Sequence, residues 1–183
     1  FSMIWLIKLL VPSKLRAILR TGEKKLLYWY RKQVIRIPVS RIKTMKIIVG
    51  AAKTKQPGWY STNEQWLDIT SSSDWDQVFG NRVLLTNVLA EHVFEHLTLA
   101  ETHLALQLIK KHMLEGGVLR IAVPDRYNPN PEYQKHVCIG GIGADASDHK
   151  QFFDFDHLSD VLKSGGFKPK IKEGYLSNGK LIQ

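Results

Sequence analysis

From residue 45 onward, short apolar runs of strand length alternate with helical patterns, and this alternation constrains the fold more than any other feature. Met45–Val49 is rich in β-branched residues and stops at Gly50. Val83–Ala90 is a second candidate for a buried strand, and Val118–Val123 is a third. Continuous apolar runs of this length are typical of strands that are covered on both faces. The sequence therefore predicts an α/β fold with a mostly parallel sheet and helices on both of its faces.

Two helices in this region have recognisable ends. Thr98 and Glu101 have the spacing of a capping box, in which each side chain bonds the backbone of the other residue. The helix that follows is expected to run towards Met113 and to stop at residues 116–117, because glycine is common just beyond a helix C-terminus. A second, shorter helix is expected over Asp156–Ser164.

The last part of the chain carries a hairpin signal. Residues 167–175 are a strand candidate, and the pair Asn178-Gly179 is typical of a tight hairpin turn. We therefore expect a C-terminal hairpin after the sheet, with its last strand incomplete because the sequence stops at Gln183. Upstream, the serine cluster at residues 71–73 is interpreted as a loop.

Positive charge is concentrated at the start of the chain. Residues 1–46 hold 12 of the 26 Lys and Arg residues but only one of the 17 acidic residues, Glu23. Residues 47–183 hold 14 basic and 16 acidic residues, so the body of the protein is slightly acidic. We therefore divide the chain into a basic N-terminal arm, residues 1–44, and a domain over residues 45–183. Any anionic partner would be recruited by the arm.

The arm has an amphipathic character. Its apolar run, Met3–Val11, is nine residues long and contains Lys8, whereas a transmembrane helix needs about 20 apolar residues. Lys24–Arg36 mixes aromatic and basic residues, as helices at a membrane interface do. The same pattern suits a helix packed on the domain or on another subunit. The sequence leaves both interpretations open and favours nucleic acid less.

The chain has a single cysteine, Cys138. One cysteine excludes a disulfide or a Cys-based zinc site within one chain. This composition fits a reducing compartment. We therefore expect a cytoplasmic protein, and we leave open a peripheral contact of the arm with an anionic membrane.

The segment His92–His96 has the H-x-x-E-H spacing of inverted zinc metallopeptidases. On a helix, His92 and His96 would lie one turn apart and could share a metal ion. However, the segment directly follows a strand candidate, and Thr98 begins a helix two residues beyond it, which favours a strand-to-helix loop. A metallohydrolase would also need a further carboxylate ligand near the two histidines. We therefore assign no metal ligand from the sequence.

Two glycine-containing loops are candidate binding elements. Residues 50–58 open with a glycine, which lets a backbone approach a nucleotide-like ligand closely, although Ala52 stands where a G-x-G motif has its second glycine. Residues 140–149 combine three glycines with Asp and His, a pattern typical of a substrate-binding loop or of a flexible surface connection. Ligands of parallel sheets bind at the carboxyl ends of the strands, where we expect these loops to lie.

Two longer motifs are more specific: E-H-x-x-E-H-L at Glu91–Leu97 and L-R-I-A-V-P-D at Leu119–Asp125. With them, the chain resembles the S-adenosylmethionine-dependent methyltransferases of the Rossmann-like class, in a poorly characterised bacterial branch. The resemblance covers roughly residues 45–176. It implies a Rossmann-like methyltransferase fold and S-adenosylmethionine as the cofactor. Three further segments carry it: Gly58-Trp59, Leu67–Thr70 and Asp148–Lys150.

The resemblance also implies a role for each matching residue. Asn63 stands where the family has an acid that accepts bonds from both ribose hydroxyls, and the adjacent Glu64 can substitute for it. Asp125 and His149 would face the methyl acceptor. His149 and His92 would be the first candidates for a general base if the acceptor is a hydroxyl or an amine. The implied cofactor-binding residues are Gly50, Ala51, Ala52, Asn63, Glu64, Asp68, Ile69, Glu91 and His92.

The function implied by the resemblance is methyl transfer from S-adenosylmethionine to an unidentified acceptor. Catalysis would depend chiefly on holding the acceptor in line with the methyl group, because the sulfonium is already a good leaving group. The alternative is a non-catalytic Rossmann-like module that the basic arm recruits to a partner or to a membrane surface.

Overall fold

The structure is a computed structural model that describes residues 22, 26, 36 and 38–183. The predictions made for the arm concern segments that lie almost wholly outside these residues. Among the residues described, no helix combines the length and the apolar character needed to cross a bilayer.

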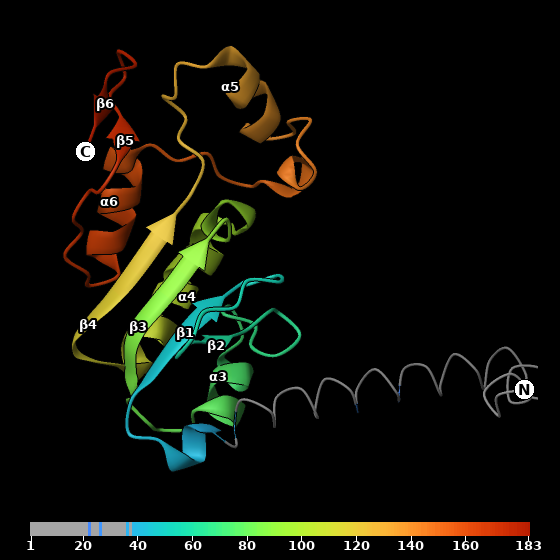
Figure 1. Ribbon diagram of the computed structural model, residues 1–183, viewed down its shortest axis with the longest axis vertical. Coiled ribbons are helices and arrows are strands. Elements are labelled where there is room, and N and C mark those ends of the chain that lie inside the picture. Colours follow the sequence, from blue (N-terminus) through green and yellow to red (C-terminus); the bar gives the residue numbers. More distant parts are fainter. Residues whose placement is uncertain (1–21, 23–25, 27–35, 37) are drawn as a thin grey trace, which may run out of the picture.

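A four-stranded parallel sheet forms the centre of the structure (Figure 1). Its strands lie in the order β2-β1-β3-β4, and each neighbouring pair is parallel. Together with the flanking helices, this sheet confirms the predicted α/β, Rossmann-like fold. The strands are β1 (Met45–Val49), β2 (Tyr60–Ser61), β3 (Leu85–Glu91) and β4 (Met113–Ala122).

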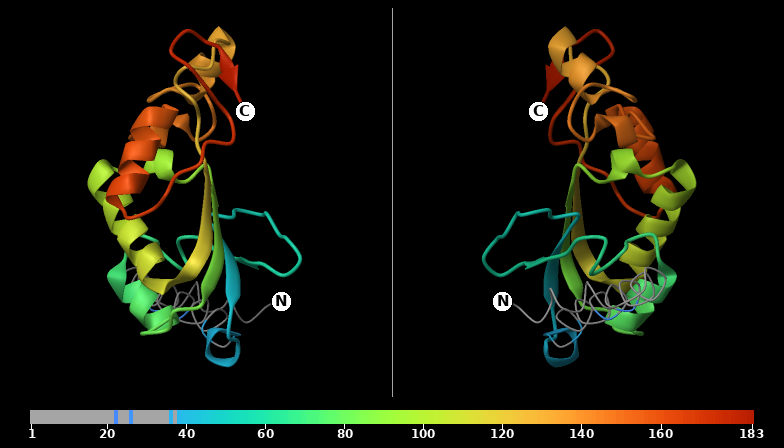
Figure 2. Two further views of the ribbon diagram at one scale, coloured as in Figure 1. Left: turned by 90° about the vertical axis from the view of Figure 1, so that its left-hand side faces the viewer. Right: turned by 90° about the vertical axis from the view of Figure 1, so that its right-hand side faces the viewer.

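Three helices lie on one face of the sheet: α3 (Ser72–Val78), α4 (Leu99–His112) and α6 (Phe155–Ser164) (Figure 2). On the other side, Figure 2 shows the loop that follows β1. The sequence predicted helices on both faces of the sheet, whereas α3, α4 and α6 all lie on one face. A fourth helix, α5 (Pro131–Val137), lies beyond the carboxyl end of the sheet (Figure 1). Two short 3₁₀ helices, η1 (Phe94–His96) and η2 (Ala146–Asp148), belong to the loops at the same end.

The core lies between the sheet and these helices. Met45, Ile47 and Val49 alternate along β1, and each is at most 2 % exposed. They belong to one cluster with Leu106 and Ile109 of α4, both fully buried. Alternate residues of a strand point to the same face, so this pattern fixes which side of β1 the helices cover.

The start of α4 confirms the predicted capping box. The Thr98 hydroxyl accepts a hydrogen bond from the Glu101 backbone N–H at 3.3 Å, and the Glu101 carboxylate accepts one from the Thr98 backbone N–H at 2.7 Å. That backbone bond lowers the pKa of Glu101. The predicted helix before Gly165 is also present as α6. The serine cluster was misinterpreted, because the Ser71 hydroxyl accepts from the Asp74 N–H and begins α3.

The predicted boundary between α4 and the next strand is wrong. The helix ends at His112, and β4 begins directly at Met113, which pairs with Leu85 and is only 7 % exposed. Between the pairs Leu85–Met113 and Asn87–Val118, β3 advances by two residues and β4 by five. The glycines at residues 116–117 therefore belong to an irregular part of the strand, where Gly116 has a φ of +75°.

The predicted C-terminal hairpin is present but shorter than expected. β5 (Gly174–Tyr175) pairs antiparallel with β6 (Leu181–Ile182), and the turn between them contains Gly179 with a φ of +77°. The strand candidate over residues 167–175 is therefore reduced to its last two residues.

His112, the last residue of α4, lies inside the core at 1 % exposure. Its ring stacks on Trp75 with the ring centroids 5.2 Å apart, and its Nδ1 lies 2.8 Å from the Arg82 carbonyl oxygen. Because a carbonyl only accepts, Nδ1 carries the proton. Nε2 is buried and has no partner among the described residues. Burial lowers the pKa of His112, since the charged ring would have to be desolvated.

We expect His112 to make the protein acid-sensitive. The unfolded chain takes up its proton near pH 6.5, whereas the folded chain takes it up at a lower pH, so stability falls as the pH drops below about 6.5. One proton accounts for a slope of at most about 1.4 kcal/mol per pH unit. Denaturant unfolding measured at several pH values between 7 and 5 gives the free energy of unfolding as a function of pH. This free energy should fall less steeply with decreasing pH for His112→Gln than for the wild type. His136→Gln, which replaces an exposed histidine, is the control. The prediction would be contradicted if the free energy of unfolding changed equally with pH in His112→Gln and in the wild type.

Candidate functional site

The strand order creates a switch point between β1 and β3. The chain passes from β1 to β2 on one side, then returns through α3 to β3 on the other side of β1. Open parallel sheets bind ligands at such a point, outside the carboxyl ends of the strands. Here the switch point is flanked by the turn after Val49 and by the segment after Glu91.

The turn after β1 requires a glycine at its first position. Gly50 has a φ of +59°, in the left-handed region that glycine occupies without strain. A Cβ at this position would come 2.5 Å from Cγ2 of Val93, in the segment after β3. Gly50 therefore lets the two loops of the switch point meet. Ala51, next in the turn, is 4 % exposed and donates its N–H to the Thr62 carbonyl at 2.8 Å.

Ala52 and Asn63 form a reciprocal pair. The Ala52 N–H donates to Oδ1 of Asn63 at 2.7 Å, and Nδ2 of Asn63 donates to the Ala52 carbonyl at 3.2 Å. This pair supports the left-handed backbone of Ala52, whose φ is +47°. The Asn63 amide therefore shapes the loop after β1, whereas the side chain of the adjacent Glu64 is exposed.

The structure gives Asp68 and Ile69 roles in packing. Oδ1 of Asp68 accepts hydrogen bonds from the Thr70 N–H at 2.9 Å and from the Thr70 hydroxyl at 2.7 Å. Ile69 is 7 % exposed within the core, and its carbonyl accepts from Nε1 of Trp75 at 3.2 Å. Both residues thus shape the approach to α3, and the Ile69 side chain belongs to the core cluster.

Glu91 ends β3 at the switch point, and His92 directly follows it. Glu91 forms an ion pair with Arg120 of β4, with 2.8 Å between its Oε1 and Nη1 of the arginine. His92 has a φ of +53°, and its side chain is 70 % exposed. Nδ1 of His92 lies 3.1 Å from Oε1 of Glu95. The left-handed backbone therefore turns His92 out of the sheet while Glu95 holds its ring.

The H-x-x-E-H segment is a strand-to-helix loop, as predicted. β3 stops at Glu91, η1 spans Phe94–His96, and α4 begins only at Leu99. His92 and His96 therefore do not lie on one continuous α-helix. Between them, Glu95 is 1 % exposed, and its second oxygen, Oε2, has no hydrogen-bond partner among the described residues.

His149 lies beside this loop although it is distant in sequence. It follows η2 and is 9 % exposed, and its Nδ1 lies 2.8 Å from the Val137 carbonyl oxygen. Its ring meets His96 edge-on, with the ring centroids 4.8 Å apart. One potential ligand atom from each of Glu95, His96 and His149 lies within 4.8 Å of the other two. These three residues are called the Glu-His-His cluster below.

Backbone bonds hold the segment after His149 against η1. The N–H groups of Lys150 and Gln151 donate to the Glu95 carbonyl at 2.7 and 3.1 Å. The Gln151 side-chain amide donates to the Leu97 carbonyl at 2.7 Å. The Glu-His-His cluster is therefore positioned by paired backbone groups from both segments.

Asp125 is engaged by backbone groups. Its Oδ1 accepts from the Tyr127 N–H at 2.8 Å, and its Oδ2 accepts from the Tyr175 N–H at 2.7 Å. Asp125 also forms a parallel bridge with Phe153. The carboxylate thus ties the hairpin to the loop after β4, which is a structural role distinct from the acceptor-binding role predicted for it.

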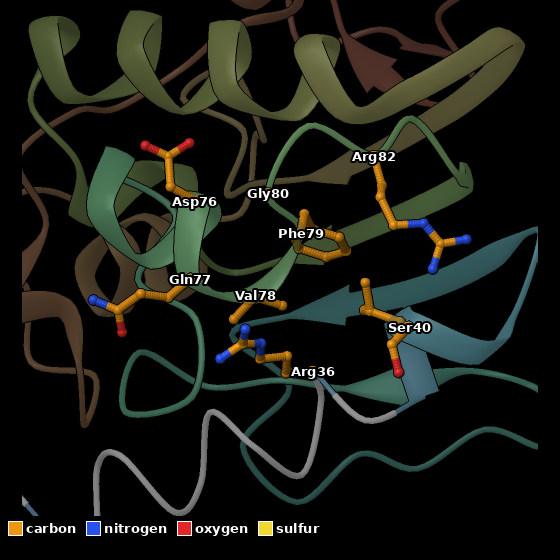
Figure 3. Close-up of a pocket in the computed structure, with 9 residues that line it drawn as sticks. Arg36, Ser40, Asp76, Gln77, Val78, Phe79, Gly80 and Arg82 are labelled. Atoms are coloured by element: carbon orange, nitrogen blue, oxygen red, sulfur yellow. The ribbon is translucent and has the colours of Figure 1, made fainter.

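A pocket of about 170 Å³ lies at the other end of the sheet (Figure 3). It is lined by the segment before β1, including Arg36 and Ser40, and by the end of α3 and the residues after it, including Asp76, Gly80 and Arg82. Arg82 is fixed there by a bond of 2.6 Å from Nη2 to the Ile42 carbonyl. The pocket contains none of the predicted site residues.

The sequence predicted no site role for Glu95 or His96. The H-x-x-E-H spacing marked both residues, but it suggested His92 and His96 as the pair that would share an ion. Only the fold brings His149 next to them.

The chain matches no protein-family model, no curated protein and no solved structure.

Proposed function

We propose that the protein transfers a methyl group from S-adenosylmethionine to an acceptor bound at the carboxyl edge of the sheet. The observation that carries the proposal is the switch point between β1 and β3. The turn Gly50–Ala52 flanks it on one side and Glu91-His92 on the other, and the sequence resemblance implies a cofactor-binding role for both. Sheets of this class bind nucleotide cofactors at such a point.

The geometry suggests how the cofactor would be held. Gly50 allows a close approach of the backbone, and Ala52 is fixed by Asn63 rather than left mobile. Glu64 is exposed next to Asn63, and its carboxylate has the acceptor capacity for both ribose hydroxyls. The methyl donor would then lie beside His92, at the end of β3.

His92 is the residue best placed to act as a general base. Glu95 is buried, and its carboxylate accepts a hydrogen bond from the Nδ1–H of His92, which keeps the proton on Nδ1 and leaves Nε2 with a lone pair. A hydroxyl or amine acceptor would give its proton to Nε2 as its oxygen or nitrogen attacks the methyl carbon. S-adenosylmethionine would supply the methyl group on a sulfonium that departs as a neutral thioether, so the part left to the protein would be to hold the acceptor in line and to take its proton at Nε2 of His92.

We expect Glu64→Ala to weaken the binding of S-adenosylhomocysteine by roughly 1–3 kcal/mol, because the ribose hydroxyls would lose their acceptor. This corresponds to a loss of affinity of about 5- to 150-fold. Calorimetric titration of both proteins measures the difference. Gln65→Ala changes an exposed neighbour and is the matched control. Equal affinities for Glu64→Ala and the wild type would remove Glu64 from the site, and absence of binding by the folded wild-type chain would contradict the proposed function itself.

A further inference from the structure

We propose that the Glu-His-His cluster is a binding site for a divalent transition-metal ion of the zinc type. Glu95 and His96 come from η1, and His149 follows η2, 53 positions after His96 in the sequence. An ion there would join the loop after β3 to the loop before α6. Glu95 also holds His92 through its other oxygen, but metal binding by the cluster does not depend on methyl transfer.

The three side chains are close to the geometry of a metal centre. Their potential ligand atoms lie within 4.8 Å of one another. Zinc–nitrogen bonds of about 2.0–2.1 Å place two tetrahedral ligands roughly 3.4 Å apart. Because the Lys150 and Gln151 bonds to the Glu95 carbonyl hold the backbone of both segments, closing the remaining gap would fall to the side-chain torsions.

Each of the two histidines in the cluster has an acceptor near its Nδ1. Nδ1 of His149 donates to the Val137 carbonyl, so the neutral ring offers its lone pair at Nε2. Nδ1 of His96 lies 3.5 Å from Oδ2 of Asp148, an orienting carboxylate. Metal-binding histidines are typically held by a carbonyl or a carboxylate in this way.

Glu95 supplies the observation that points to an absent ligand. Its side chain is 1 % exposed, yet Oε2 has no hydrogen-bond partner among the residues described. A buried carboxylate oxygen without a partner is costly, and a cation compensates the cost directly. Oε1 is already used by His92, so Oε2 remains available for an ion.

The ligand set indicates the class of ion. Two imidazoles and one carboxylate suit zinc and neighbouring first-row ions, whereas magnesium prefers a shell of oxygen ligands. Three protein ligands also leave a coordination position for water or for a substrate atom.

The test is a calorimetric titration of metal-stripped, full-length protein with ZnCl₂, without any S-adenosyl compound. We expect one zinc ion per chain and no comparable binding of Mg²⁺. Glu95→Gln and His149→Gln should each weaken zinc binding by at least about tenfold, because the loss of even an outer partner typically costs 10- to 100-fold. His136→Gln, which changes an exposed histidine on α5, should bind zinc as the wild type does.

Circular dichroism identifies variants that fail to fold, and His96→Gln replaces Glu95→Gln if the buried substitution is not tolerated. With Co²⁺ in place of zinc, the visible absorption spectrum should show nitrogen and oxygen ligands and should be lost in the same variants. The proposal is overturned if the wild type binds no zinc at millimolar concentration. It is also overturned if folded cluster variants bind zinc like the wild type, or if His136→Gln loses as much affinity as they do. None of these outcomes bears on cofactor binding, which is measured separately.

Discussion

Replacing Trp75 with alanine is expected to lower the free energy of unfolding by about 3–5 kcal/mol, the usual cost of removing a large buried aromatic side chain. Trp75 is fully buried, and its ring stacks on the rings of Phe79 and His112, with both centroid distances at 5.2 Å. Its Nε1 also donates to the Ile69 carbonyl. The substitution would leave a cavity where α3 meets the end of α4. Small domains have only about 5–15 kcal/mol of stability, so much of the total would be lost.

Denaturant unfolding of the wild type and of two further variants tests this expectation. Trp75→Phe keeps an aromatic ring but loses the bond to Ile69, so its loss should be intermediate. Trp59 is only half-buried, and Trp59→Ala should cost clearly less than Trp75→Ala. A loss for Trp75→Ala no larger than that for Trp59→Ala would contradict the core described here.

Replacing Gly50 with alanine is expected to destabilise the protein by about 2–5 kcal/mol and to displace the turn after β1. The left-handed backbone costs an alanine about 1–2 kcal/mol. The new Cβ would also come 2.5 Å from Cγ2 of Val93, and overpacking of this kind typically adds about 1–3 kcal/mol. Because the turn flanks the proposed cofactor site, affinity for S-adenosylhomocysteine should fall as well.

Two matched variants separate the cost of the left-handed backbone from the cost of the steric clash with Val93. Gly58 has a φ of +77° in the same loop, but no atom lies within 4 Å of the Cβ position, so Gly58→Ala should show the cost of the backbone alone. Adding Val93→Ala to Gly50→Ala should recover part of the stability, because it removes the colliding methyl group. If Gly50→Ala and Gly58→Ala were equally stable in thermal or denaturant unfolding, the close approach of the two loops would be wrong.

The elements with strong local signals could be predicted from the sequence. Met45–Val49 is a run rich in β-branched residues before a glycine, apolar except for Lys46, and it forms β1 as expected. Thr98 and Glu101 carry their own capping bonds, so the start of α4 follows from local chemistry. The Asn178-Gly179 pair similarly identified the turn between β5 and β6.

The end of α4 could not be predicted in the same way. Gly116 and Gly117 resemble a helix stop, but the pairing of Met113 with Leu85 overrides that signal. Ending the helix at His112 allows Met113 to be buried in the core, which stabilises this boundary. The pairing of Met113 with Leu85 depends on a strand that is distant in sequence. Ser71 was missed for a different reason, since a serine cluster is typical of both loops and helix starts.

In the candidate site, too, features with local sequence signals could be predicted, and contacts between distant segments could not. The sequence marked the loops after β1 and β3, because their motifs are contiguous. It did not show that backbone N–H groups engage the Asp125 carboxylate or that Asn63 bonds Ala52. Nor did it place His149 beside Glu95, because that contact depends on the path of the chain between β4 and α6.

The most direct test of the account is amide hydrogen exchange of the full chain with and without saturating S-adenosylhomocysteine. We expect slower exchange in the turn after β1, residues 50–63, and in the segment after β3, residues 91–97, because a bound cofactor would cover the switch point. The residues around the pocket in Figure 3, residues 76–82, should not change. Absence of protection anywhere at millimolar ligand, or protection confined to that pocket, would contradict cofactor binding at the carboxyl edge of the sheet.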